Sequence, residues 1–178
     1  MNKIFKASGF FNVPDGTKVA SLFNSTDVSG NIAGPKEGIS VAIGEIDPGT
    51  KSKIHVHPLV SQVTFVLDGA ISIYMKDSTA SEKYKLELKK DEAVMTEEGT
   101  FFQLINESDE ICRVMYIVTP EFLFETADKK VVYNDAVVLE MDWEELAHLD
   151  WKAPELLNCN ITAEARQKAL ERITAAKR

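Results

Sequence analysis

The middle of the chain, from about residue 38 to residue 119, is a series of short apolar runs separated by turn residues. The runs are rich in Val, Ile, Phe and Tyr, which favour strands. They are Ile39–Ile46, Ser61–Leu67, Ala70–Lys76, Tyr84–Leu88, Glu92–Met95, Thr100–Ile105 and Ile111–Val118. Turn sequences such as Leu67-Asp68-Gly69 stand between them. Strands spaced by about 8–12 residues, with no helical pattern between them, predict an antiparallel sandwich or barrel.

The two ends of the chain carry a different pattern. Residues 1–37 are rich in Gly, Asn, Ser and Pro, with a few short apolar pieces, and we expect them to wrap around a barrel formed by residues 38–120. Residues 121–178 are expected to form a C-terminal extension. No internal repeat or long linker divides these parts, and 178 residues is a typical length for one domain.

The C-terminal extension contains two predicted helices. The first covers Asp142–Leu149, and the second covers Ala163–Lys177 with Thr162 as its N-cap residue. Trp143 and Trp151 flank the first of these helical stretches, and we expect them to dock the extension on the barrel.

The composition argues against several classes of protein. A formal net charge of −8 disfavours a surface that follows nucleic-acid phosphates. The longest apolar run is Val114–Val118, far short of the ~20 residues that cross a bilayer, and the N-terminus shows no apolar secretion signal. Cys112 and Cys159 match no metal-binding spacing and are expected to be reduced thiols. Together these features predict a cytoplasmic protein.

Two of the chain's three histidines, His55 and His57, stand two residues apart in the stretch Lys53-Ile-His-Val-His-Pro. Alternate side chains of a strand share a face, so both imidazoles should point the same way. Such a pair offers two nitrogen ligands to a transition metal. The alternative is a pair of histidines that line a pocket or hydrogen-bond one another through water.

The residues around the pair follow a fixed spacing. They are Gly49, five residues, His55-x-His57, four residues, Gln62, six residues and Gly69. This arrangement resembles the first signature of the cupin superfamily, in which a Glu stands at the position of Gln62. The resemblance covers about residues 38–120. It implies a jelly-roll barrel in which the two histidines and the residue at position 62 are metal ligands.

The second cupin signature is only partly present. Its frame falls here on Asp91, Glu97, Gly99, Phe102 and Asn106, of which only Gly99 and Asn106 agree with the signature. Phe102 stands where cupins carry a third histidine, and a phenylalanine cannot bind a metal. The resemblance therefore implies three ligands, His55, His57 and Gln62, for a divalent Fe, Ni, Mn or Zn ion. Because the Gln62 carbonyl is a neutral donor, we expect the site to be weak and to have open positions.

Five further side chains are candidates to bind a substrate: Lys53, Thr64, Tyr74, Phe102 and Gln103. Lys53 should share the face of His55, where it could bind a carboxylate or phosphate, unless it lies exposed at the rim. Thr64 should face inward with Gln62, and Phe102 should form an apolar wall. Gln103 could face inward only through a bulge, and the sequence leaves the face of Tyr74 open.

The resemblance implies a mononuclear metal enzyme of the dioxygenase, isomerase or lyase type that acts on a small organic molecule. The alternative is a non-catalytic small-molecule-binding or sensory cupin with a degenerate metal site. Many cupins pair through barrel edges, so we also expect a homodimer, with no nucleic-acid or membrane partner.

Overall fold

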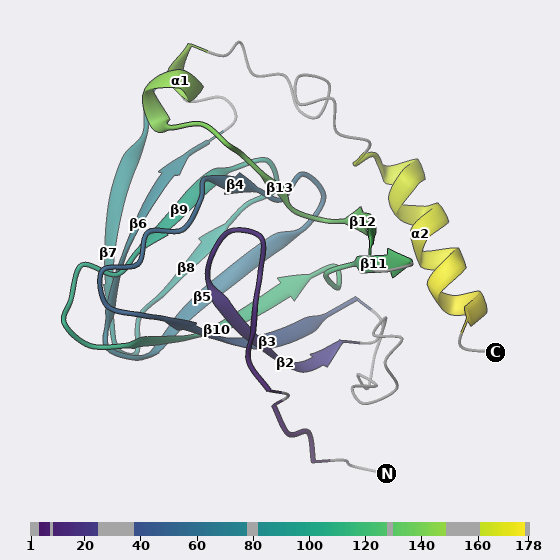
Figure 1. Ribbon diagram of the computed structural model, residues 1–178, viewed down its shortest axis with the longest axis horizontal. Helices are drawn as coiled ribbons and strands as arrows, with labels where there is room; N and C mark the ends of the chain where they lie inside the picture. The colour runs from purple at the N-terminus through teal and green to yellow at the C-terminus, as the bar shows by residue number, and fades with distance from the viewer. Residues whose placement is uncertain are drawn as a thin grey trace.

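Two antiparallel sheets face each other in the computed structural model, which describes residues 4–7, 9–24, 38–77, 82–127, 130–148 and 161–176 (Figure 1). The six-stranded sheet contains, in spatial order, β1 (Phe11–Asn12), β2 (Lys18–Asn24), β3 (Ser40–Ile46), β10 (Cys112–Thr119), β5 (Ser61–Asp68) and β8 (Ala93–Thr96). The five-stranded sheet contains β13 (Val137–Val138), β4 (His55–Val56), β9 (Phe101–Ile105), β6 (Ala70–Lys76) and β7 (Tyr84–Lys89). A separate hairpin is formed by β11 (Phe124–Ala127) and β12 (Lys130–Asn134).

The main core lies between the two sheets. Val66 and Val114 project from the six-stranded sheet, and Ile73, Phe102 and Leu104 project from the five-stranded sheet into the same buried cluster. Burying apolar side chains from both sheets in this way stabilises the jelly roll by about 25 cal/mol for each Å² removed from water. The predicted antiparallel jelly roll is confirmed.

All seven predicted strands are present, with no end shifted by more than one residue. On β5 the alternation is as expected: Gln62, Thr64 and Val66 are buried, whereas Val63 and Phe65 are only half-buried on the outer face. The sequence reading missed β2, which is a full strand within the segment expected to wrap the barrel. The strand expected to carry the histidine pair is present as the short β4, whereas the three strands after residue 120 are not predicted by the sequence.

The backbone conformation agrees with the glycine positions of both signatures. Gly49 and Gly69 have φ values of +70° and +82°, which side-chain-bearing residues rarely adopt. Asp91 stands where the second signature has a glycine. Although it carries a side chain, its φ is positive, +68°, and no other non-glycine residue in the described ranges has a positive φ. Asn106 is fully buried, and its amide group donates to the carbonyl oxygens of Ile46 and Glu110. It therefore ties the end of β9 to the end of β3 in the other sheet and to the loop before β10.

The first part of the C-terminal extension covers the outer face of the five-stranded sheet. Helix α1 (Trp143–Ala147) begins at Asp142, whose carboxylate accepts the backbone N–H groups of Glu144 and Glu145. Trp143 packs with Ile54 and Val56 in a second apolar cluster. The expectation that Trp143 docks the extension is therefore confirmed, whereas Trp151 lies outside the described residues.

The second helix, α2 (Ala163–Ala176), lies beside the β11–β12 hairpin (Figure 1). Thr162 caps it by accepting the backbone N–H of Ala165. Arg166 forms an ion pair with the fully buried Asp135 at 3.3 Å. Within the described part of the chain, no helix is both long and apolar enough to cross a membrane.

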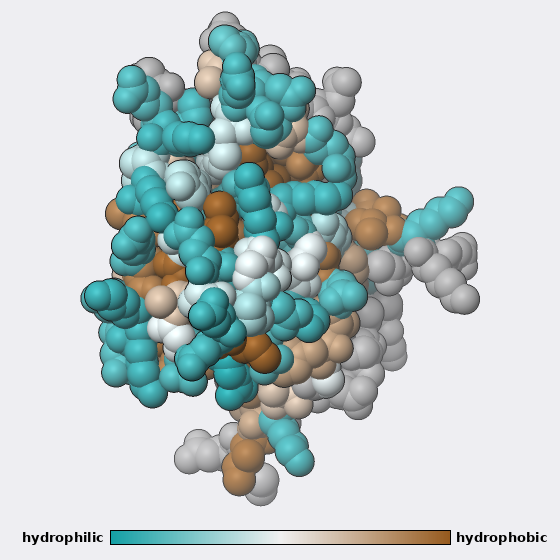
Figure 2. All heavy atoms as spheres, turned by 60° about the vertical axis from the view of Figure 1, so that its left-hand side comes forward, coloured by the Kyte–Doolittle hydropathy of each residue, from teal (hydrophilic) through white to brown (hydrophobic). Residues whose placement is uncertain are grey.

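One side of the molecule is mostly hydrophilic. Figure 2 shows the side that lies at the left of Figure 1, and its hydrophobic residues form only small separate patches. The edge strand β7 carries Lys85, Glu87 and Lys89 between its apolar residues. Charges on an edge strand discourage pairing with another chain.

Candidate functional site

The histidine pair lies where β4 joins the five-stranded sheet. His55 is paired in register with Phe102 of β9, so the two side chains share a face. His55 and His57 are each 5% exposed, and their ring centroids are 5.6 Å apart. Ile54 and Val56 alternate with them and belong to the outer cluster. The predicted alternation is therefore confirmed, and both imidazoles face the interior between the sheets.

Each of the two rings has a nitrogen atom that makes no direct hydrogen bond among the described residues. His55 Nδ1 lies 3.0 Å from the carbonyl oxygen of Lys53. Since a carbonyl only accepts, Nδ1 carries the proton, and Nε2 of the neutral ring keeps its lone pair. His57 Nδ1 is buried without a hydrogen-bond partner. His57 Nδ1 is therefore a second nitrogen atom in the same interior that can bind a ligand or a metal ion.

Burial keeps both rings uncharged. Desolvation lowers the pKa of His55, although the carboxylate of Asp15 and the Lys53 carbonyl act in the opposite direction. Desolvation, with a smaller contribution from His55, lowers the pKa of His57 to about 3. Both imidazoles are therefore neutral near pH 7, which is the form that binds transition metals.

Phe102 occupies the third-histidine position and packs on both rings. Its centroid is 3.9 Å from that of His55 and 5.2 Å from that of His57. Phe122 contacts the ring of His57 at 5.4 Å between centroids. The histidines are thus bordered by aromatic side chains, as expected for an apolar wall at Phe102.

Gln62 and Thr64 lie on the inner face of β5, 6% and 1% exposed. The amide nitrogen of Gln62 donates to the Thr64 hydroxyl at 3.1 Å. This bond fixes the orientation of the amide and leaves its carbonyl oxygen as the donor atom for a ligand.

A side chain missed in the sequence, Asp15, reaches the histidine pair from the turn between β1 and β2. One of its carboxylate oxygens, Oδ2, is 3.7 Å from His55 Nε2. The other, Oδ1, accepts the backbone N–H and the hydroxyl of Thr17, each at 2.9 Å. The backbone N–H of Lys53 donates to the Asp15 carbonyl at 2.7 Å. The purple N-terminal segment of Figure 1, which rises in front of the sheets and returns to β2, carries this turn.

Tyr116 brings a further polar atom to the interior of the six-stranded sheet. It is paired in register with Thr64, and its buried hydroxyl has no hydrogen-bond partner. Burial and the negative charge of Asp15 raise its pKa. The ring lies directly over Gly44, where an added Cβ would stand 2.5 Å from a ring carbon. Gly44 is therefore the residue that makes room for this tyrosine.

Three of the proposed substrate-binding residues lie elsewhere. Gln103 keeps the regular alternation: it donates to the Ser52 carbonyl at 2.5 Å and accepts the indole N–H of Trp143 at 2.9 Å, on the outer face. Tyr74 is paired with Gln103 and packs against the same outer cluster. Lys53 is 44% exposed and forms an ion pair with Glu140. These three side chains therefore lie outside the interior around the histidine pair, because no bulge turns Gln103 inward and Lys53 has a partner at the rim.

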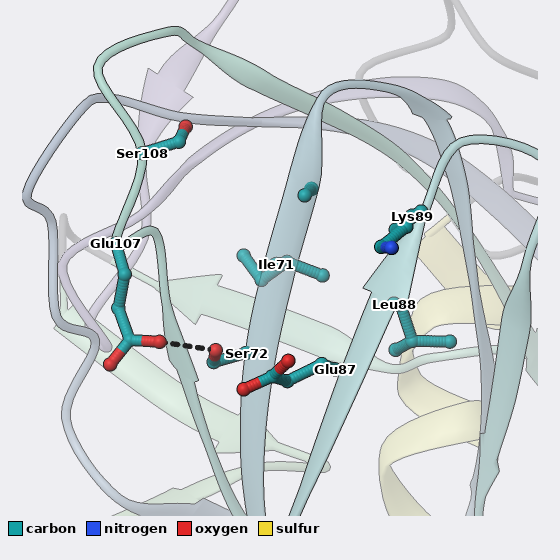
Figure 3. A pocket seen from close by; sticks show the side chains of 8 residues that line it. Ile71, Ser72, Glu87, Leu88, Lys89, Glu107 and Ser108 are labelled. Carbon is teal, nitrogen blue, oxygen red and sulfur yellow. Dashed lines mark hydrogen bonds between the residues drawn. The ribbon is translucent and has the colours of Figure 1, made fainter.

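Among the described residues, no three His, Cys, Asp or Glu side chains are grouped closely enough to hold a metal ion as they stand. A pocket of about 260 Å³ opens between β6, β7 and the loop after β9 (Figure 3). Glu107 there accepts the hydroxyl of Ser72 at 2.5 Å and the ammonium group of Lys85 at 2.8 Å. The strongest polar groups of this pocket are thus paired with each other, and none of the histidines lines it.

Comparisons with known proteins identify the fold. Residues 42–118 match a family model described as a cupin domain. No curated protein sequence matches the chain. Among solved structures, the CENP-C cupin domain of Drosophila melanogaster superposes with a TM-score of 0.51 at 15% identity, over 65% of this chain and 81% of that one. KdgF from Halomonas sp. gives 0.52 at 15%, over 67% and 94%.

A third structure is CapF from Staphylococcus aureus, described as a capsular polysaccharide assembling protein. It superposes with a TM-score of 0.55 at 19% identity, over 75% of this chain and 32% of CapF. This chain therefore corresponds to about a third of that protein. At such identities the likeness shows the fold alone. The family match spans β3 to β10, which include the histidine pair, Gln62 and Phe102. Residues 42–118 of this chain are a cupin domain.

Proposed function

We propose that this cupin binds one divalent transition metal through His55, His57 and Gln62 and presents it to a small organic molecule. The observation that carries the proposal is the pair of buried, neutral imidazoles, with a lone pair on His55 Nε2 and an unpartnered Nδ1 on His57. A buried polar nitrogen without a partner is rare unless water, an ion or a ligand completes it.

The donor set fits a divalent Fe, Ni, Mn or Zn ion, because imidazole nitrogen suits Fe, Ni and Zn, and carbonyl oxygen such as that of Gln62 suits Mn. The Lys53 carbonyl holds the His55 ring in the tautomer that leaves Nε2 free. Thr64 orients the amide of Gln62, and Phe102 keeps water from one side of the rings. When bound, such an ion supplies Lewis-acid or redox chemistry at its open positions.

The cupin resemblance extends the proposal to an enzyme of the dioxygenase, isomerase or lyase type. The mixed lining supports a small organic substrate: amide and hydroxyl groups of Gln62, Thr64 and Tyr116 on one sheet, and aromatic rings on the other. A CapF structure contains the inhibitor 3-isopropenyl-tropolone, so a protein with this fold accepts a small organic molecule.

The cellular part of the proposal is a cytoplasmic protein that forms homodimers. The cytoplasmic location is supported by Cys112, a buried free thiol whose pKa is raised to about 11 by desolvation and by the charge of Asp68. Such a thiol is poorly reactive and suits a reducing compartment.

Calorimetric titration of the metal-stripped protein with Fe²⁺, Ni²⁺, Mn²⁺ and Zn²⁺ tests the proposal. We expect at least one ion to bind with a Kd well below millimolar. His55→Ala should abolish that binding, whereas His148→Ala, at an exposed histidine at the end of α1, should leave it unchanged. Equal affinity in wild type and His55→Ala would contradict the metal site.

A second function, a non-catalytic small-molecule-binding cupin, is favoured by one observation. Phe102 replaces a metal ligand with an aromatic ring that packs directly on His55. Binding of a small organic ligand that survives treatment with a chelator would support this function over the metal-dependent one.

A further inference from the structure

The interior around the histidine pair is closed to solvent. His55 and His57 are each 5% exposed, and the Nδ1 atom of His57 is buried without a hydrogen-bond partner. An ion or a small molecule can reach this nitrogen only if a side chain that covers it moves aside. The side chains that pack on the His57 ring therefore decide where the interior opens.

Two aromatic side chains pack on the His57 ring, and they are held in different ways. Phe102 is 1% exposed and lies in β9, which is paired with β4 on one side and β6 on the other. Phe122 contacts the ring at 5.4 Å between centroids, is half-buried, and lies in neither sheet. Displacing Phe102 would break the five-stranded sheet, whereas Phe122 can move without breaking any strand pairing of the jelly roll.

The backbone around Phe122 is held mainly by side chains. The N–H of Phe122 donates to the Ser40 hydroxyl at 3.0 Å, and its carbonyl oxygen accepts from the Asn24 amide group at 2.7 Å. The N–H of Leu123 donates to the Asp135 carboxylate at 2.7 Å. A segment with so few bonds to its surroundings can open locally while the strands stay paired.

Helix α2 holds the same segment through Arg166. The Nε atom of Arg166 lies 3.3 Å from Asp135 Oδ2, and Nη2 donates to the carbonyl oxygen of Glu121, which directly precedes Phe122. Leu123 belongs to the apolar cluster between α2 and the β11–β12 hairpin, and these elements lie together beside the two sheets in Figure 1. The position of Phe122 therefore depends on the contacts of Arg166.

We propose that residues 121–123 form a gate over the histidine pair, which Phe122 closes and Arg166 holds closed. Opening moves Phe122 away from the His57 ring and leaves the jelly roll intact. The purpose of the gate rests on the proposed function, since only a protein that takes up an ion or a small molecule needs such an opening. The gate lies outside the residues 42–118 that match the cupin family model, so it is an addition to the cupin domain of this chain.

Labelling of the metal-free full chain with diethyl pyrocarbonate, which acylates neutral imidazole nitrogens, tests the gate. Mass spectrometry gives the labelling rate of the peptide that carries His55 and His57, relative to the exposed His148. We expect Phe122→Ala to be labelled at this peptide at least about tenfold faster than wild type, because a large apolar side chain no longer favours the closed state. Phe124→Ala is the matched control: it removes the same ring from a side chain that is 45% exposed and should label at the wild-type rate.

A second variant tests the role of Arg166. Arg166→Lys keeps a positive charge beside the buried Asp135 but cannot reproduce both contacts of the guanidinium group. We expect labelling of the histidine peptide at least about threefold faster than in wild type, the effect of losing roughly one hydrogen bond from the closed state. Arg113→Lys, at an exposed ion pair with Glu45, is the control and should not change the rate.

Hydrogen exchange of the wild-type protein needs no variant. The N–H groups of Phe122 and Leu123 should exchange at least about tenfold faster than that of Val66, because they are released by local opening and Val66 only by unfolding of the core. The Val66 N–H donates to the Glu92 carbonyl within the six-stranded sheet, and its side chain is fully buried.

The outcomes separate the gate from the proposed function. Unchanged labelling in Phe122→Ala, or exchange of Phe122 and Leu123 as slow as that of Val66, would overturn the gate and leave metal binding by the histidines untouched. A wild type that binds no metal, together with faster labelling in Phe122→Ala, would overturn the metal site while the gate stands. Arg166→Lys and the wild-type exchange decide the question even if Phe122→Ala does not fold.

Discussion

The ring of Phe102 packs on the imidazole of His55 with 3.9 Å between the ring centroids. The two residues are register partners on β9 and β4, so the sheet itself sets this contact. Phe102 stands at the position where the cupin resemblance implies a third histidine. The contact therefore replaces a metal–ligand bond with apolar packing, and the change Phe102→His should reverse this.

We expect Phe102→His to tighten metal binding by at least about tenfold, because it restores an imidazole beside the other two ligands. The metal-free variant should be less stable by about 1–3 kcal/mol, since a polar ring replaces a buried apolar one. Calorimetric titration and urea unfolding measure the two effects. Phe102→Leu is the control, which loses the ring without adding a ligand and should not tighten binding. Affinity equal to that of wild type would contradict a site beside Phe102.

Acid should destabilise the metal-free protein through His57. Its pKa is about 3 in the folded state and near 6.5 when unfolded, so between these values the unfolded chain binds a proton that the folded protein does not. The contribution of the neutral His57 ring to the free energy of unfolding is therefore fully present above pH 6.5. Between pH 6.5 and about pH 3, the free energy of unfolding falls by about 1.4 kcal/mol for each pH unit. The lowered pKa of His55 acts in the same direction.

Urea unfolding at pH 7.5 and pH 5.5, with a chelator present, measures this loss. His57→Gln should reduce the difference between the two pH values by about 1–2 kcal/mol, whereas His148→Gln should not change it. Equal pH dependence in wild type and His57→Gln would show that His57 is not buried as a neutral ring.

We expect Gln103 to contribute to the free energy of unfolding and not to the affinity for metal. Gln103→Ala leaves the indole N–H of Trp143 and the carbonyl of Ser52 without their partners. A buried group left unpaired costs about 1–3 kcal/mol. We expect urea unfolding to show a loss of that size, with unchanged metal affinity. Gln167→Ala, on the exposed face of α2, is the control. A large loss of affinity in Gln103→Ala would restore Gln103 to the site.

We expect homodimers to form through the outer face of the six-stranded sheet. Met95 is 59% exposed there, and Val63, its register partner, and Phe65 are half-buried on the same face. Because each chain has a net charge of −8, an apolar patch is where two copies can meet with little repulsion. Sedimentation at micromolar concentration should give twice the 19.8 kDa of one chain. Met95→Lys should shift the protein to a monomer, and a wild type that sediments only as a monomer would contradict the prediction.

The strands could be predicted from the sequence because alternation and turn residues are local signals. β5 illustrates this, since Gln62 and Thr64 were assigned to the inner face from the period of two alone. The same rule argued against Gln103 facing inward, and the structure agrees with the rule. Tyr74 could be assigned only with the register of β6 against β9, which the apolar pattern does not specify.

Asp15 illustrates what local patterns cannot predict. The Val13-Pro14-Asp15-Gly16 stretch has the residues of an ordinary turn, and it lies 40 positions before His55 in the sequence. Only the path of β2 along β3 and the bond from Lys53 to the Asp15 carbonyl bring it to the imidazole. Contacts of this kind depend on tertiary structure and leave no spacing that could be recognised in one sequence.

The central claim is that the histidine pair holds a metal ion, and the most direct measurement is the metal content of the protein purified without added metal. Elemental analysis of wild type and of the double variant His55→Ala/His57→Ala, prepared side by side, is required. The account predicts one Fe, Ni, Mn or Zn ion per fully loaded wild-type chain, substoichiometric if the site is weak, and none in the double variant. Equal metal content in the two proteins, or no metal in wild type even after incubation with these ions, would contradict it.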